Sequence, residues 1–240
     1  MIKYLQLPFY FDAQTMRQEV SRLASERWKL HYQKLHYEGE WSALPLRSEN
    51  GEIDNIIVSP HPDPVYKDTA LLELCPYIKE ILKTFQCPLL SVRLLKLNAG
   101  AVIKEHRDHG LCFEKGEIRL HIPVITHDLL EFYLAGERLY LKEGECWYMN
   151  FNLMHAINNN SPVDRIHLVV DANVNDWVRT LFAENSLNKK EMEEPGHDDR
   201  TKRLMIERLR EMNTDTANRM ADELEASLKI SKAGISSNVQ

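Results

Sequence analysis

The sequence lacks the features that mark several classes of protein. It has only four cysteines in 240 residues, scattered and without a Cys-x-x-Cys pair, which excludes the disulfide framework of a small secreted domain. No apolar run approaches the ~20 residues that a membrane-spanning helix needs. The first residues also lack the apolar stretch of a signal peptide. These absences predict a cytoplasmic protein with reduced thiols.

The chain also lacks a net positive charge. The chain has 36 acidic and 30 basic residues, a formal net charge of -6. Because nucleic acids and anionic membranes attract cationic surfaces, this balance argues against either as a partner. The hydrophobic share of 43% and the charged share of 28% are ordinary for a globular protein. The length suits one domain of moderate size with an appendage.

The composition changes near residue 176. Of the aromatic residues, only Trp177 and Phe182 follow that point, and charged residues become more frequent. Residues 191–199 have the polar composition of a linker, and apolar residues then return at helical spacing. We therefore expect a domain over residues 1–175 and a C-terminal helical region over 176–240. The amphipathic tail leaves a homodimer open.

Strands dominate the first part of the chain. Asp12 and Pro76 are suited to begin two short helices. Short strands separated by glycine turns predict an antiparallel barrel or sandwich. The expected strands are residues 89–97, 117–125, 130–134, 138–141, 146–151 and 165–171.

Two of these strands share one polar pattern. Arg119 and His121 alternate with aliphatic residues in one strand, and Arg165 and His167 do so in the other. Because strand side chains alternate between faces, each strand presents one apolar face and one Arg-x-His face. A single such strand is expected to face solvent, but two in one barrel favour a shared polar cavity. Pro123 in the first strand predicts an edge or rim position.

The tripeptide His-x-Asp occurs three times, and only its context is informative. His61 lies in a proline-rich loop and His197 in the polar linker, where a solvated loop is the better interpretation. His106 and Asp108 instead follow a long strand and a turn, and His155 comes later in the strand-rich part. Two imidazoles and one carboxylate on one face of a barrel can bind Fe(II) and leave positions open for a chelating cosubstrate and dioxygen.

Further candidates lie on the strands around this set. An arginine deeper in the barrel, such as Arg165, could bind the far carboxylate of a chelating cosubstrate through two hydrogen bonds. Arg93 shares a face with Leu95 and could reach a substrate, although an ordinary strand arginine is the simpler interpretation. His167 either contacts substrate or fills the cavity wall.

The chain resembles the aspartyl/asparaginyl β-hydroxylase family of Fe(II)/2-oxoglutarate-dependent dioxygenases, which includes bacterial proline hydroxylases. The helical tail also resembles that of the bacterial proline hydroxylases. The matching segments occur in order at residues 41–46, 103–108, 119–123, 144–150, 155–158 and 165–171.

The resemblance implies a mainly β fold with flanking helices around a double-stranded β-helix core, also called a jelly roll and cupin-like. It implies hydroxylation of an unactivated C–H of an amino acid, with 2-oxoglutarate and dioxygen converted to succinate and CO2. It assigns the Fe(II) ligands to His106, Asp108 and His155. It assigns the cosubstrate carboxylate to Arg165, helped by Arg119 and His121. Because the eukaryotic Asp/Asn-hydroxylating members lack the carboxylate ligand, Asp108 favours the bacterial small-substrate branch.

Two other functional classes remain open. A jelly-roll binding or sensor module would bind ligands without consuming 2-oxoglutarate, and the intact ligand set with Arg165 counts against it. A cupin-like metal isomerase or hydrolase would use a metal-bound water, would need no arginine at that position and would be active without oxygen. The residues do not decide whether the amino-acid substrate is free, peptidyl or carrier-bound.

Overall fold

The computed structural model describes residues 1–58 and 64–186, together with scattered positions between 203 and 225. The chain divides into two compact units, Met1–Glu191 and Met192–Gln240. The helices expected after residue 200 lie largely outside the described residues. Among the helices that are described, none is long and apolar enough to cross a membrane.

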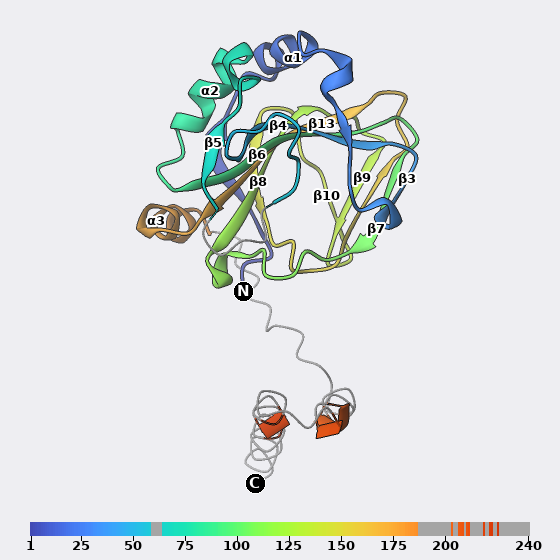
Figure 1. Ribbon diagram of the computed structural model, residues 1–240, viewed down its shortest axis with the longest axis vertical. Helices are drawn as coiled ribbons and strands as arrows, with labels where there is room; N and C mark the ends of the chain where they lie inside the picture. The colour runs from blue at the N-terminus through green and yellow to red at the C-terminus, as the bar shows by residue number, and fades with distance from the viewer. Residues whose placement is uncertain are drawn as a thin grey trace. The chain divides into compact units, whose positions relative to one another are not determined.

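The first unit is built on two antiparallel sheets (Figure 1). The larger has the strand order β1-β11-β8-β13-β6-β4-β2, with β5 beside β4, and the smaller has the order β10-β9-β12-β7-β3. The larger sheet contains β1 (Tyr4–Tyr10), β2 (Lys29–Leu30), β4 (Trp41–Glu49), β5 (Tyr66–Asp68), β6 (Leu89–Leu97), β8 (Glu117–Ile125), β11 (Glu145–Met149) and β13 (Arg165–Asn173). The smaller contains β3 (Tyr37–Glu38), β7 (Val102–His106), β9 (Leu130–Leu134), β10 (Glu137–Leu139) and β12 (His155–Asn159).

This architecture confirms the predicted mainly β, double-stranded β-helix fold. The six expected strands are present as β6, β8, β9, β10, β11 and β13, the first three with unchanged bounds. Strand β4 was not expected from the alternation of polar and apolar residues. Its first six residues are all buried, so it shows no polar face, and it contains Pro45.

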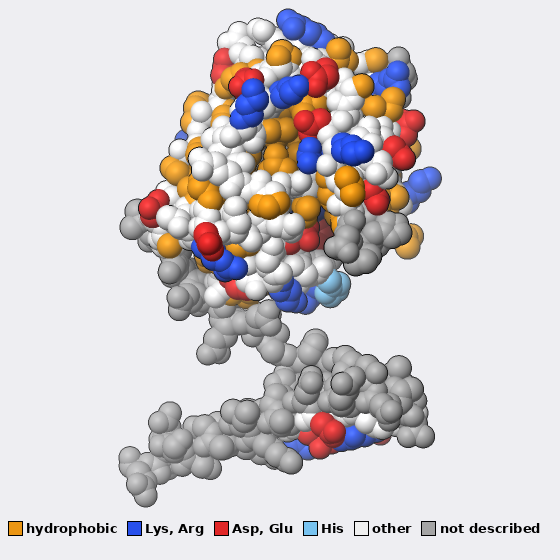
Figure 2. All heavy atoms as spheres, turned by 60° about the vertical axis from the view of Figure 1, so that its left-hand side comes forward, with side chains coloured by type: hydrophobic (Ala, Val, Ile, Leu, Met, Phe, Trp, Pro, Cys, Tyr) orange, Lys and Arg blue, Asp and Glu red, His pale blue; other side chains and the backbone are white. Residues whose placement is uncertain are grey.

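Three helices cover the outer face of the larger sheet (Figure 1): α1 (Ala13–Ser21), α2 (Pro76–Lys83) and α3 (Asp176–Asn185). Short 3-10 turns lie at Ser25–Arg27, Lys34–His36, Leu72–Leu74 and Phe113–Lys115. Met16, Ile78 and Phe182 from the three helices share an outer core with Leu120 and Leu168 of the sheet. On the face that bears α2 and α3, hydrophobic side chains reach the surface between charged ones (Figure 2).

The first two helices begin where carboxylates meet unpaired backbone N–H groups. Asp12 accepts hydrogen bonds from the backbone N of Gln14 (2.9 Å) and Thr15 (3.3 Å) at the start of α1. Glu19 of α1 is buried and accepts from the backbone N of Tyr77 (2.6 Å) and Ile78 (3.0 Å) at the start of α2. One carboxylate therefore caps α2 and joins it to α1.

A second core lies between the two sheets. The polar faces of β8 and β13 point toward this core. Leu97 and Val169 of the larger sheet pack there with Phe132 and Ile157 of the smaller. The aliphatic residues of β8 and the even-numbered ones of β13 belong to the outer core instead. The alternate positions, which carry the two Arg-x-His pairs, therefore face the space between the sheets, as predicted.

The edge position predicted for β8 from Pro123 is wrong. The strand lies between β11 and β13 inside the larger sheet. The ladder to β13 shifts register between Ile166 and His167, which lie opposite Ile125 and Pro123. The proline is accommodated because this irregularity interrupts the regular hydrogen bonding that needs its missing N–H.

Candidate metal centre

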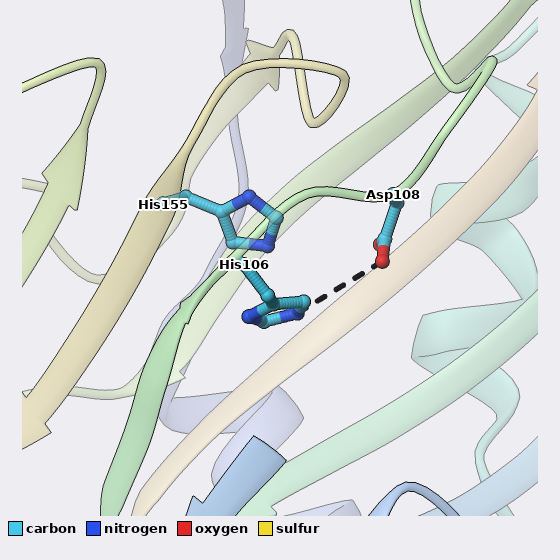
Figure 3. Close-up of side chains that lie close together, drawn as sticks. All are labelled: His106, Asp108 and His155. Atoms are coloured by element: carbon cyan, nitrogen blue, oxygen red, sulfur yellow. Dashed lines mark ion pairs between the residues drawn. The ribbon is translucent and has the colours of Figure 1, made fainter. Parts of the chain in front are cut away.

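The three predicted metal ligands converge at the end of the smaller sheet (Figure 3). His106 ends β7, His155 begins β12, and the two residues are paired in register across these neighbouring strands. Asp108 follows in the loop after β7. One ligand atom from each residue lies within 4.8 Å of the others. The antiparallel pairing therefore brings together residues that are far apart in the sequence.

Backbone carbonyls set the orientation of both imidazoles. Nδ1 of His106 lies 2.8 Å from the carbonyl oxygen of Lys104, and Nδ1 of His155 lies 3.0 Å from that of Leu153. Because a carbonyl oxygen can only accept, each Nδ1 carries the proton. Each Nε2 is then left with a free lone pair, which is the arrangement that a metal-binding histidine requires.

The electrostatics keep the ligands in their metal-binding forms. Burial lowers the pKa of His155 to about 4, so its imidazole is neutral near pH 7. Burial alone would raise the pKa of Asp108, but Arg119 and the neighbouring histidines outweigh it and hold that pKa below its ordinary value. A neutral imidazole and an ionised carboxylate are the species that bind a divalent cation.

A buried ion-pair chain continues from Asp108. Nη1 of Arg119 donates to Oδ2 of Asp108 (2.8 Å), while its Nε and Nη2 donate to the two carboxylate oxygens of Asp171 (2.6 and 3.0 Å). Nη2 of Arg93 also donates to Asp171 (2.9 Å), and Nη1 of Arg93 donates to the carbonyl oxygen of Ile56 (3.3 Å). The side chain of Asp171 is completely buried.

A second basic cluster lies deeper between the sheets. Arg165 is 2% exposed, and its Nη2 donates to Nδ1 of His167 (2.9 Å). His167 Nδ1 lies 3.2 Å from Nδ1 of His121. Because an arginine can only donate, Nδ1 of His167 is unprotonated and the proton of this neutral ring sits on Nε2. Burial lowers the pKa of His121 and of His167 well below the ordinary value, so the cluster carries its positive charge on Arg165.

The basic cluster has the donors of an anion site. Among the described residues, the donors Nε of Arg165 and Nε2 of His167 are buried without a hydrogen-bond partner. Nε2 of His121 is also buried without a partner, but it is an acceptor, because Nδ1 of this neutral ring donates to the unprotonated Nδ1 of His167. No ion pair joins Arg165 to a carboxylate in the described part of the chain. A buried cation with unused N–H groups is costly unless an anion accompanies it. Arg165 therefore fits the carboxylate of a cosubstrate such as 2-oxoglutarate.

Two cavities meet at the metal ligands. A narrow inner cavity is lined by His155, Phe151, His121 and Arg165. An open outer cavity of about 770 Å³ is lined by Tyr32, Arg93 and Glu117, among others. His106, Asp108 and Arg119 line both. A metal held here would be reached from two sides.

The structure separates the two residues expected to contact substrate. Arg93 lines the outer cavity, and its buried Nε has no partner among the described residues. His167 lines neither cavity and lies behind Arg165 and His121. The geometry therefore places Arg93 in the wall of the outer cavity and His167 in the wall of the basic cluster.

Several site residues were not identified from the sequence. His31 stacks on Trp41 in the outer cavity, with ring centroids 3.5 Å apart and planes inclined by 14°. Burial lowers the pKa of His31 to about 3. His36 lies beside His106, with ring centroids 4.8 Å apart. These residues come from irregular segments without a periodic signal. Asp171 could have been found, because it continues the alternation that places Arg165 and His167 on one face.

Comparisons with known proteins find similar sequences. The family described as aspartyl/asparaginyl beta-hydroxylase matches residues 11–174. A curated relative, L-proline cis-3-hydroxylase 2 from a Streptomyces species, is 26% identical over 136 residues, which are 55% of this chain and 47% of the relative. The chain thus spans about half the length of this relative.

Solved structures show more distant similarity. One is an oxidoreductase of the 2OG-Fe(II) oxygenase family from Burkholderia pseudomallei, with 14% identity and a TM-score of 0.46 over 72% of this chain and 88% of that one. Another is a prolyl-4-hydroxylase from Pseudomonas putida, with 12% identity and a TM-score of 0.44 over 73% of this chain and 94% of that one.

Proposed function

Because the chain belongs to the aspartyl/asparaginyl β-hydroxylase family, we propose that it is an Fe(II)- and 2-oxoglutarate-dependent dioxygenase. Its substrate is an amino acid that is free, peptidyl or carrier-bound, and the reaction hydroxylates an unactivated C–H. The curated relative supports an amino-acid substrate, since its name describes a proline hydroxylase. We further expect a cytoplasmic protein without a nucleic-acid or membrane partner, and a homodimer remains open.

One observation carries the proposal: the convergence of His106, Asp108 and His155 at the junction of two cavities. Both imidazoles present Nε2 because carbonyls hold Nδ1, and the carboxylate reduces the charge of the site. Three protein ligands leave the other coordination positions free for small molecules. When bound, Fe(II) and 2-oxoglutarate together with dioxygen supply the oxidising power for C–H hydroxylation and yield succinate and CO2.

The basic cluster would bind and orient the cosubstrate. Arg165 offers unused N–H groups beside the inner cavity, and no protein carboxylate competes for them among the described residues. His121 lines the same cavity, and Arg119 lies between it and the outer one. The inner cavity is enclosed by aromatic and aliphatic side chains, which exclude water and strengthen the charge interaction.

The outer cavity would receive the amino-acid substrate. Its wall combines the stacked rings of His31 and Trp41 with the guanidinium of Arg93 and the carboxylate of Glu117. Burial raises the pKa of Glu117, with Asp171 adding to the effect. The cavity thus offers an apolar wall, a cation and an acid, which are the groups needed to orient a zwitterion or an amide beside the metal.

The proposal is tested by turnover with the full chain. Purified protein with Fe(II), 2-oxoglutarate and ¹⁸O₂ is offered L-amino acids in free form and within short peptides, and succinate and labelled product are measured. We expect substrate-dependent succinate formation with ¹⁸O in the product, lost in Asp108→Ala and in His155→Ala. Absence of succinate with every substrate, or full turnover in either variant, would contradict the proposal.

A further inference from the structure

We propose that Asp171 is a positioning residue for the metal: through Arg119, it fixes which oxygen of Asp108 faces the bound cation. This inference rests on the proposed function only in taking His106, Asp108 and His155 as the metal ligands. Asp171 does not itself lie among those ligands, and neither cavity is lined by it. Its influence would therefore be transmitted through a single guanidinium.

The sheet places Asp171 between two arginines. It lies on β13, directly opposite Arg119 of the neighbouring strand β8. On the other side of β13, Arg93 of β6 is paired with Val169, two residues before Asp171 on the same face. Side chains at directly opposed and diagonal positions of one face are within contact distance. The carboxylate is therefore held between two cations, one from each of the two strands that flank β13.

The contacts give Arg119 one defined orientation. Its Nε and Nη2 form a two-point interaction with the two oxygens of Asp171, at 2.6 and 3.0 Å. This fork fixes the plane of the guanidinium, which a single contact would not do. The remaining nitrogen, Nη1, then points at Oδ2 of Asp108 over 2.8 Å. Asp171 thus determines where the third nitrogen of Arg119 lies.

At the metal centre, the two carboxylate oxygens of Asp108 therefore have different partners. Oδ2 is occupied by Arg119, whereas Oδ1 lies 3.9 Å from Nε2 of His106, on the side of the other ligands. With Oδ2 engaged, the carboxylate would bind a cation through one oxygen. One-point binding leaves the additional coordination position that a two-point carboxylate would take. We therefore expect Asp171 to affect both the affinity of the centre and its geometry.

A purely structural role for Asp171 would have a different signature. The residue is fully buried and balances two arginines, so its loss is expected to lower stability in either case. Glu19 supplies a matched control, because it is also a buried carboxylate with two short hydrogen bonds, at the α1–α2 junction in the outer core. A change at the metal centre in Asp171 variants that is absent in Glu19→Gln separates positioning from stability.

The test is Co²⁺ binding by the full chain, without oxygen or 2-oxoglutarate, followed by titration and by the visible ligand-field spectrum. We expect Asp171→Asn to weaken Co²⁺ binding about 10- to 100-fold and to change the bands, as we also expect for Asp108→Asn. Arg119→Lys keeps the positive charge, but a single ammonium group cannot hold Asp171 at two points and also donate to Asp108. This variant should therefore behave like Asp171→Asn. Glu19→Gln should match the unaltered protein in affinity and spectrum.

The outcomes are distinguishable. If the unaltered protein binds no Co²⁺, the proposed metal centre fails, and the inference fails with it. If the unaltered protein binds Co²⁺ and Asp171→Asn binds it equally with the same spectrum, the inference is overturned while the metal centre stands. If Asp171→Asn does not fold, Arg119→Lys decides: unchanged Co²⁺ affinity and bands in that variant overturn the inference, and weaker binding with altered bands supports it.

Discussion

Nη2 of Arg165 donates a hydrogen bond to Nδ1 of His167 over 2.9 Å, two residues along one face of β13. The histidine can orient the guanidinium, but it is neutral and cannot balance the charge. Burial alone lowers the pKa of Arg165 to about 9, and no carboxylate in the described part of the chain offsets that cost. The protein thus maintains a buried cation whose natural partner is an anionic ligand.

Arg165→Met should separate folding from cosubstrate binding. Without ligand, the variant should be as stable as the unaltered protein or more stable, because it removes a buried unpaired charge. With Mn²⁺ present throughout, 2-oxoglutarate is added at about 100 times its Kd for the unaltered protein. This addition should raise the free energy of unfolding of the unaltered protein by about 2.7 kcal/mol, seen as a rise in Tm, and should leave that of the variant almost unchanged. Arg47→Met removes an arginine already paired with Asp68 and is the control. An equal ligand response in Arg165→Met would refute the role of Arg165.

The metal-free protein should lose stability as pH falls from 7 to 5. Burial lowers the pKa of His31 to about 3 and of His155 to about 4, and lowers those of His121 and His167 well below 6.5. Below pH 6.5 the unfolded chain takes up protons on these rings while the folded chain does not, so acid favours unfolding. The contribution of each such histidine grows as pH falls and approaches a slope of roughly 1.4 kcal/mol per pH unit near pH 5.

Denaturant unfolding with a chelator present, measured across this pH range, checks the sign and the slope. His31→Gln should reduce the slope by the contribution of one histidine, which approaches roughly 1.4 kcal/mol per pH unit near pH 5. His127→Gln, at an exposed loop position, is the matched control. Stability that is constant or rises from pH 7 to pH 5 would contradict the burial of neutral histidines in the folded protein.

Glu19→Gln should weaken the fold without touching the metal centre. The substitution keeps the size of the side chain but replaces a carboxylate that accepts two backbone hydrogen bonds at the start of α2. A loss of about 1–3 kcal/mol in the free energy of unfolding is expected, because charge-assisted bonds to a helix N-terminus are weakened. Urea unfolding measures this loss. Unchanged stability would show that the cap contributes little to the outer core.

The basic cluster could be predicted because it follows simple periodicity, whereas the metal ligands were assigned from the context of one His-x-Asp tripeptide and from the family resemblance. Alternation within a strand places Arg119 with His121 and Arg165 with His167 on the inner face, whichever strands pair. His106 and His155 meet because one ends a strand and the other begins its partner. The same alternation places Asp171 on that inner face, whereas its two arginine partners become known only from the strand pairing.

The outer cavity could not be predicted in the same way. Its wall depends on His31, Tyr32 and His36, which lie in short irregular segments where side-chain direction follows no period. Their positions are set by tertiary contacts such as the stacking of His31 on Trp41. Substrate choice depends on this wall, which explains why the sequence indicates the chemistry of the centre more clearly than the identity of the substrate.

The central claim is that one site binds Fe(II) and 2-oxoglutarate together. The most direct measurement is the visible spectrum of the 240-residue chain without oxygen, with each component added alone and then both. We predict a weak charge-transfer band that needs both additions and that is diminished in Arg165→Met at limiting 2-oxoglutarate. No band with both components, or a band of unchanged strength in Arg165→Met, would contradict the account.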